Sequence, residues 1–256
     1  MSEGKGDQPF FIGFAPVPAP LRGFLIGAAL LLVAGLGALG FAMGAAQDDP
    51  GQGALRFDYG RQTLQGVIEP GAYPIFHVTQ GTERVPAGES FVMTAGGKSG
   101  VAPRANPLAG GLAQASGVLL ERGALYMLQV RGGRNGLRSL DGDVPEVPAP
   151  EPLGTWRLTG EICDGKCLAG AMRPGRGLAH KACANLCLLG DVPPVFVSTH
   201  PVAGEQFMLV TGPNGGRLPA AAYDAVGEYV SVTGTLAMHG TTAVFAIDPA
   251  TIARVP

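Results

Sequence analysis

An apolar segment without a single charge, from Gly23 to Ala46, limits what the beginning of this 256-residue chain can become. A helix rises 1.5 Å per residue, so a helix of this length spans about 36 Å and crosses a hydrocarbon core of about 30 Å. We therefore expect a cytoplasmic N-terminal segment at 1–20 and a transmembrane helix at 21–46.

The charges beside this segment predict its orientation. Arg22 precedes the apolar run, and aspartates follow it at 48–49. Because positively charged flanks stay in the cytoplasm, we expect a single-pass inner-membrane protein with its N-terminus cytoplasmic and its later domains periplasmic. A cleaved signal peptide is the alternative, since the Ala-Met-Gly-Ala-Ala end of the run resembles a cleavage site. The run is, however, longer than the usual signal core of about 7–15 residues.

The rest of the chain contains an internal repeat. The matched segments are 63–68 with 157–162, 87–91 with 203–207, 115–120 with 232–237, and 126–130 with 243–247. The offset rises from 94 residues at the first match to 116 at the second, so the second copy carries about 22 additional residues. The additional residues fall within the stretch 163–194, which holds all four cysteines.

Each copy has the pattern of short β-strands. Glycine (41 residues) and proline (22 residues) make up about a quarter of the chain, which favours many turns. Val230, Val232 and Leu236 alternate with polar or small residues, as in a half-buried strand. Gly123 and Gly240 fall where hairpins need a residue that tolerates positive φ.

These patterns predict an all-β fold behind the transmembrane helix. We expect two small OB-like β-barrel domains at 54–140 and 154–256, with a Cys/His-rich helical insertion at 163–194 in the second. A small open β-sandwich explains the same repeat. The acidic, proline-rich residues 141–153 between the copies are expected to form an extended linker.

The cysteines and one histidine follow the spacing Cys163-x3-Cys167-x12-His180-x2-Cys183-x3-Cys187. Residues 179–189 have a helical composition, which puts positions 180, 183 and 187 on one helix face. If Cys167 approaches from the preceding strand end or loop, three sulfurs and one imidazole gather. Cys167, His180, Cys183 and Cys187 are therefore candidate ligands for a thiophilic metal such as zinc or copper.

Disulfides are the alternative for the same residues. The cysteine count is even and the expected compartment is oxidising, so bridges among Cys163, Cys167, Cys183 and Cys187 would staple the insertion. A bridge between Cys183 and Cys187 within one helix has poor geometry. One bridge with two free thiols is a third arrangement. His180 has no role in a disulfide, so its position discriminates between these interpretations.

Other residues carry weaker signals. A formal net charge of −2 gives no reason to expect a nucleic-acid partner. The sequence contains no phosphate-binding loop, nucleophile elbow or H-E-x-x-H motif. Glu161 and Asp164 are the only carboxylates close to the cysteines in sequence, which is too few for a convincing general acid–base pair. We expect three isolated histidines to lie at the surface or at strand edges, and the single tryptophan to lie in the core or an interface. These residues are His77, His200, His239 and Trp156.

The pattern Asp164-x-Lys166-Cys167-x2-Gly170-x-Met172-x-Pro174-Gly175-x-Gly177-x2-His180-x2-Cys183-Ala184-x2-Cys187, with Pro193-Pro194 behind it, resembles a group of bacterial exported or membrane-anchored OB-like proteins. The lead-in at 10–14 is also similar to the start of that group. The resemblance implies that Cys167, His180, Cys183 and Cys187 form the shared constellation. Cys163 stands where the group more often has an aliphatic residue.

Together these features favour a binding protein over an enzyme, with no catalytic residues assigned. We expect an anchored periplasmic accessory protein that binds a membrane or periplasmic partner, in the setting of a respiratory or redox complex. The alternative is a metal-binding or electron-transfer protein that uses the Cys/His cluster. A thiol-reactive enzyme is the third hypothesis.

Overall fold

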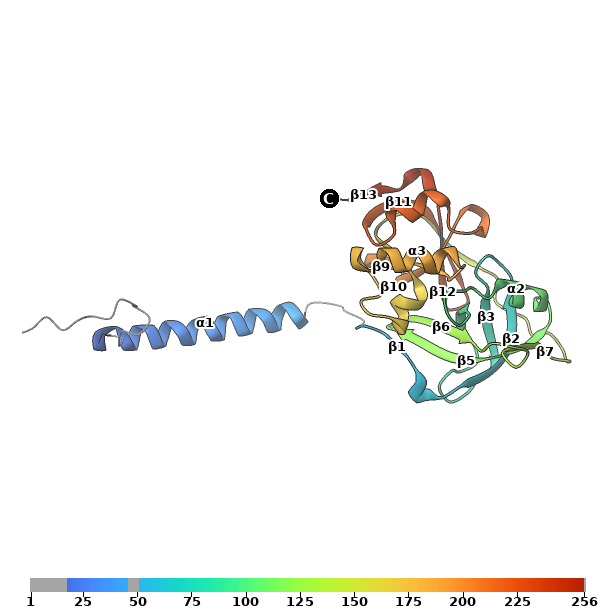
Figure 1. The fold of residues 1–256 in the computed structure, drawn as a ribbon, viewed down its shortest axis with the longest axis horizontal. Coiled ribbons are helices and arrows are strands. Elements are labelled where there is room, and N and C mark those ends of the chain that lie inside the picture. Colours follow the sequence, from blue (N-terminus) through green and yellow to red (C-terminus); the bar gives the residue numbers. More distant parts are fainter. Residues whose placement is uncertain (1–17, 46–50, 256) are drawn as a thin grey trace, which may run out of the picture. The chain divides into compact units, whose positions relative to one another are not determined.

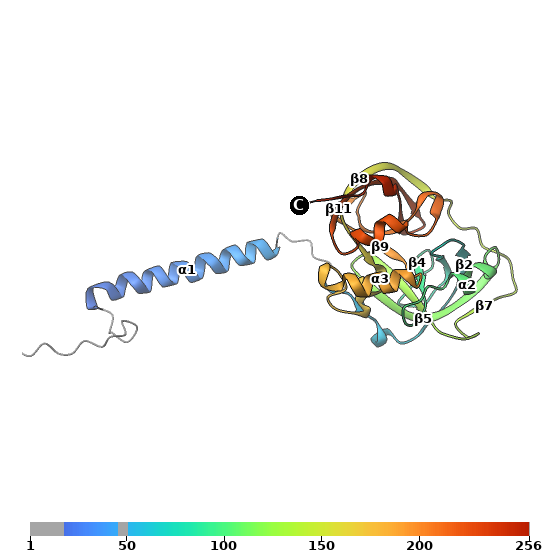
Figure 2. The ribbon, with the colours of Figure 1, turned by 45° about the horizontal axis from the view of Figure 1, so that its top comes forward.

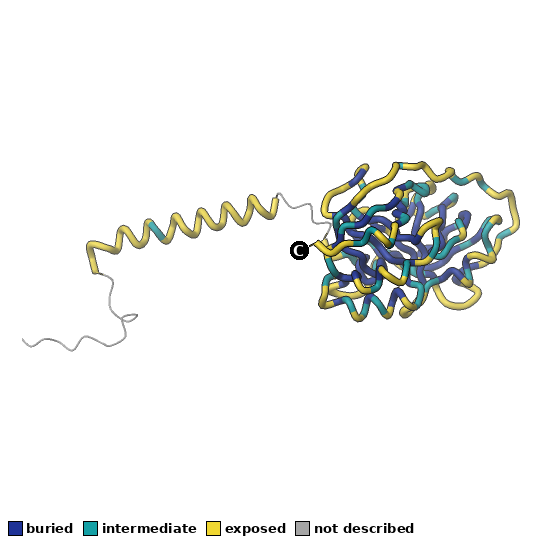
Figure 3. Tube along the Cα trace, turned by 90° about the horizontal axis from the view of Figure 1, so that it is seen from above, coloured by how far each residue is buried: buried dark blue, intermediate teal, exposed yellow. Residues whose placement is uncertain are grey.

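The structure is a computed structural model that describes residues 18–45 and 51–255. The chain divides into two compact units, residues 1–49 and 50–256. In the first, helix α1 (Ala19–Ala45) has a mean hydropathy of 2.4 over its most apolar window and no buried residue, as the yellow tube of Figure 3 shows. It is long and apolar enough to cross a membrane. The helix begins two residues before the expected range 21–46, whose last residue lies outside the described part.

The second unit is built of strands that close into two barrels (Figure 1). The first barrel has the neighbour order β2-β3-β4-β6-β5, and β5 pairs again with β2. Its strands are β2 (Gln62–Glu69), β3 (Ile75–Gln80), β4 (Ser90–Thr94), β5 (Leu112–Arg122) and β6 (Leu125–Val130). Two short strands, β1 (Ala54–Leu55) and β7 (Leu137–Ser139), add to β5, and α2 (Ala102–Ala105) follows β4.

The second barrel repeats this order as β8-β9-β10-β12-β11, closed by β11 against β8. Its strands are β8 (Glu151–Asp164), β9 (Pro194–Val202), β10 (Glu205–Thr211), β11 (Tyr229–His239) and β12 (Thr242–Ile247), with β13 (Ala253–Arg254) on β11. In each barrel the third strand runs parallel to the fifth, and the other pairs are antiparallel. Because both sheets close, the open β-sandwich is the wrong alternative.

Two boundaries follow from these strands. β8 begins at Glu151, inside the range 141–153 expected for the linker. The polypeptide between β8 and β9 is the cysteine-bearing insertion, and it contains helix α3 (Lys181–Leu189). Gly123 and Gly240 have φ values of 53° and 62°, as the hairpin prediction requires.

The two barrels share a hydrophobic core where they meet, in addition to the core inside each. The first barrel contributes Tyr73, Ile75, Val92, Leu120, Leu125 and Met127 to the shared core. The second barrel contributes Cys163, Leu168, Ala169, Val195, Val197, Phe207, Leu209 and Val244. Burial of one large apolar side chain is worth about 1.5–3 kcal/mol, so this shared core outweighs any single polar contact between the barrels.

The shared core explains why some strands lack an alternating pattern. In β4, Phe91 and Met93 face the inside of the first barrel, while Val92 faces the second barrel, and all three are buried. In β9, Phe196 lies inside the second barrel and Val195 faces the first. Strands covered on both faces are apolar throughout, as in other fully buried sheets. Figure 2 shows α3 where the two barrels meet.

A polar clamp joins the barrels beside this core. Glu69 Oε2 lies 2.9 Å from His77 Nε2, and Glu69 Oε1 lies 2.6 Å from His239 Nδ1 of the other barrel. Burial would raise the pKa of Glu69, but hydrogen bonds from His239 and His77 outweigh it and hold the pKa at about 2. The expectation of isolated histidines is therefore wrong for both, and His77 is buried; His200 is exposed, as expected.

Trp156 also departs from its expected place. Its side chain is exposed on β8, and its indole N–H donates to the Leu153 carbonyl 2.9 Å away. The tryptophan is thus neither in a core nor between the barrels.

Replacing Glu69 with glutamine is expected to lower the free energy of unfolding by about 1–3 kcal/mol at neutral pH, because a charge-assisted contact is lost. Since the folded state lowers this pKa, the wild-type contribution is present above the ordinary value of 4.5 and disappears as the pH falls toward about 2. The free energy of unfolding of the variant should therefore fall less steeply than that of the wild type as the pH is lowered from 4.5 toward 2. Denaturant unfolding of the detergent-solubilised protein, followed by Trp156 fluorescence, measures both effects.

The matched control is Glu83→Gln, which removes an exposed carboxylate of the same barrel. Equal stabilities for the two variants across the acid range would show that the clamp contributes nothing.

Candidate metal centre

The insertion begins at the end of β8, and short helical turns after this strand carry the candidate ligands. Asp164 ends β8, and a π-helical turn, η4 (Cys167–Ala171), follows directly. A 3₁₀ turn, η5 (Leu178–His180), then leads into α3. The helix expected at 179–189 is therefore present, with its first turn tightened into a 3₁₀ turn. Cys167 approaches from the turn after the strand, on the opposite side from α3.

Asp164 organises both halves of this arrangement. Its side chain is fully buried, and its Oδ1 accepts a hydrogen bond of 2.8 Å from the Cys167 backbone N–H. Its Oδ2 lies 2.8 Å from Nε2 of His180, which is itself buried. A carboxylate beside one ring nitrogen keeps the proton there and leaves Nδ1 with a lone pair for a metal. One carboxylate thus positions the turn and selects the histidine tautomer.

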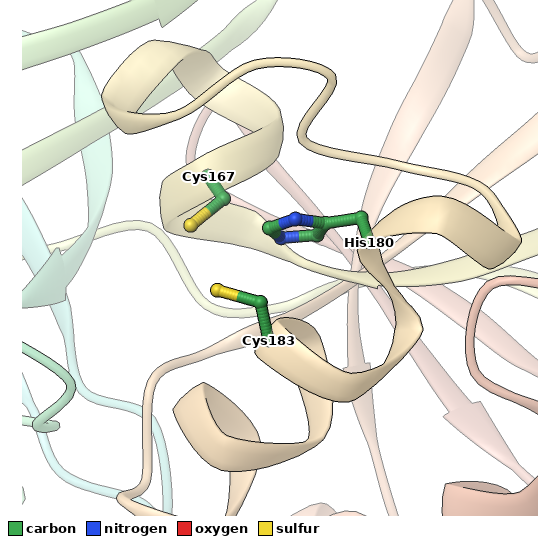
Figure 4. Close-up of side chains that lie close together, drawn as sticks. All are labelled: Cys167, His180 and Cys183. Carbon is green, nitrogen blue, oxygen red and sulfur yellow. The ribbon is translucent and has the colours of Figure 1, made fainter.

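Three of the predicted ligands converge. The ligand atoms of Cys167, His180 and Cys183 all lie within 4.8 Å of one another. Figure 4 shows the two sulfurs and the imidazole ring close together, with Cys183 on α3 and Cys167 on the opposite turn. Zn–S bonds of about 2.3 Å in a tetrahedral site put sulfurs about 3.8 Å apart, so a small closing movement brings these atoms to bonding distance.

Cys187, the fourth predicted ligand, lies beside this trio. Its sulfur falls within 4.8 Å of Cys167 Sγ and of an Asp164 oxygen. Lys98 Nζ lies 3.3 Å from Cys187 Sγ and 2.9 Å from Cys183 Sγ. Hydrogen bonds from Cys167 and then Lys98 lower the pKa of Cys187 against the effect of burial, while the shared hydrogen bond and burial raise the pKa of Cys167. A proton between these two sulfurs therefore favours Cys167, and a metal bound to both would displace it.

Cys163 is separate from the ligands. It is buried in the core shared by the barrels, and its thiol donates to Glu161 Oε1 over 2.9 Å. Burial, and then the Glu161 charge, raise the pKa of this thiol. All four cysteines lie in the described part of the chain, and none of them is in a disulfide. The ligand atoms that converge are those of Cys167, His180 and Cys183, while Cys187 approaches Cys167 and Asp164.

A loop of the first barrel frames the centre. Lys166 Nζ donates to the carbonyls of Ala95 and Gly97 at 2.7 and 2.8 Å, and Gly100 N–H donates to the Gly190 carbonyl at 2.7 Å. These bonds hold the loop that carries Lys98 against α3. The centre is therefore assembled from both barrels.

Sequence reasoning missed two members of this centre. Asp164 was noted in the resemblance pattern and weighed for acid–base chemistry but was given no role at the centre, although its position three residues before Cys167 is the spacing of a side chain that caps a following turn. Lys98 carries no local signal, because it comes from the other barrel.

Replacing Asp164 with asparagine is expected to weaken metal binding about 10- to 100-fold. The Cys167 N–H requires an oxygen at one position, so the amide NH₂ would face His180 Nε2 and force the ring proton onto Nδ1. Competition titration against a chromophoric chelator measures the affinity, and ¹⁵N NMR of the imidazole reports the tautomer without metal.

The control is Asp143→Asn, at an exposed position in the segment that connects the two barrels. An unchanged tautomer and affinity in the Asp164 variant would contradict the role given to the carboxylate.

Comparison of the chain with models of protein families, with curated proteins and with solved structures yields no match.

Proposed function

We propose that this protein is anchored in the membrane by α1 and binds one thiophilic metal ion, zinc or copper, in its second barrel. The ligands are Cys167, His180 and Cys183, with Cys187 beside them as the third sulfur and the fourth candidate ligand. The observation that carries this proposal is the mutual approach of three soft or borderline donor atoms within 4.8 Å. The Asp164 carboxylate beside Nε2 of His180 supports it, because metal-binding histidines have such partners.

The scaffold that presents the site is, in this proposal, a duplicated OB-like barrel. The support is the shared strand order of the two barrels, in which the first strand pairs with the second and the fourth and the third pairs with the fifth. The matched sequence segments also fall on equivalent strands. Segment 63–68 lies on β2 and its match 157–162 on β8, while 115–120 lies on β5 and its match 232–237 on β11.

The proposed setting is the inner membrane, with both barrels on the periplasmic side. Arg22 near the start of α1 supports this orientation. We further propose an accessory role toward a membrane or periplasmic partner, such as a respiratory or redox complex. Exposed leucines on the segment that carries the ligands support such docking; they are Leu178, Leu186 and Leu189.

Anaerobic titration of the reduced, detergent-solubilised full-length protein with Zn²⁺ or Cu⁺ tests the proposal. One ion per chain is expected, with thiolate-to-metal absorption for copper. Cys183→Ser and His180→Gln should each weaken binding by at least about tenfold, because each removes a ligand.

The matched control is Cys163→Ser, which removes a sulfur outside the ligand set and keeps a donor for Glu161. If Cys163→Ser and Cys183→Ser change the affinity equally, or if the wild-type protein binds neither ion, the proposed function is wrong.

A further inference from the structure

Met172 stands where burial gives no reason for a large apolar side chain. It follows the turn η4 directly, and it is 45% exposed to solvent. Its Sδ lies 3.7 Å from Sγ of Cys183, on the ligand-bearing helix α3. A methionine that is 45% exposed is buried only in part, so burial alone does not account for the contact between the two sulfurs. The thioether instead adds a fourth soft donor at the solvent side of the centre.

The distance fits two sulfurs on one ion. Metal–sulfur bonds of about 2.3 Å with a tetrahedral angle separate two sulfur ligands by about 3.8 Å. The Met172–Cys183 separation of 3.7 Å already has this value. On the basis of the proposed metal centre, we propose that Met172 takes the fourth ligand position beside Cys167, His180 and Cys183 in place of Cys187, and that the ion bound is Cu(I).

The choice of ion follows from the chemistry of the thioether. Thiolate and thioether ligands select Cu(I), whereas zinc sites are built from cysteine, histidine and carboxylates. Met172 therefore contributes to the binding of Cu(I) and little to that of Zn²⁺. Its side chain discriminates between the two ions that the cysteines and His180 accept alike.

Its position also makes Met172 the ligand that leaves first. Cys167 and His180 are buried and held by Asp164, whereas the neutral thioether of Met172 faces solvent. An incoming thiolate or thioether of a partner replaces it at the ion: the Cu–S bond to Met172 breaks as the Cu–S bond to the partner forms. The ion stays Cu(I) throughout, so the exchange needs no oxidant or reductant.

Met172→Leu in the full-length protein tests this inference, because leucine keeps the size and removes the sulfur. We expect a Cu(I) affinity about tenfold weaker in competition with bicinchoninate, and a Zn²⁺ affinity unchanged within about twofold. X-ray absorption at the copper edge should count one sulfur fewer. Met238→Leu, on β11 and outside the insertion, is the matched control.

The outcomes separate this inference from the proposed function. If the wild-type protein binds neither ion, both are wrong. If it binds zinc but not Cu(I), or if Met172→Leu leaves the sulfur count and the Cu(I) affinity unchanged, the metal centre stands and the role of Met172 is wrong. If Met172→Leu weakens the binding of Cu(I) and of Zn²⁺ equally, the proposed selectivity for Cu(I) is also wrong.

Discussion

The apolar contact between the two barrels is the constraint on which the rest of the structure depends. Val92 of the first barrel and Val195 of the second point away from their own barrel interiors and are buried against each other's barrel. Because this contact fixes how the barrels meet, the loop carrying Lys98 lies on the helix of the insertion. The candidate metal centre is consequently a property of the pair of barrels and not of the second barrel alone.

Within the centre, a single buried carboxylate connects backbone and ligand. Asp164 sits at the last position of β8, so its place is set by the strand pairing of the second barrel. From there it caps the turn that presents Cys167 and holds the ring of His180. A buried carboxylate without such partners would be costly, so both hydrogen bonds also stabilise its own burial. The ligands are in this way preorganised by the fold before any ion binds.

The predicted ligands divide according to how local their placement is. His180, Cys183 and Cys187 are spaced along one helix, and that spacing is visible in the sequence because a helix has a fixed period. Cys167 was expected from the opposite side, and its turn does lie there. By contrast, Lys98 is 85 positions from Cys183, and His239 is 170 positions from Glu69. No local pattern reports on contacts of that kind, which is why the histidines were misread as isolated.

The sequence by itself determined the apolar helix, the two β regions and the location of the ligand-bearing insertion, because hydropathy, turn residues and helical spacing are local properties. Only the tertiary structure decided that both sheets close, that the barrels share a core, and that Cys163 belongs to this core and not to the ligand set. Those outcomes depend on which outward-facing side chains find an apolar partner across the molecule. That match is a property of two surfaces in space, and no single stretch of the chain contains it.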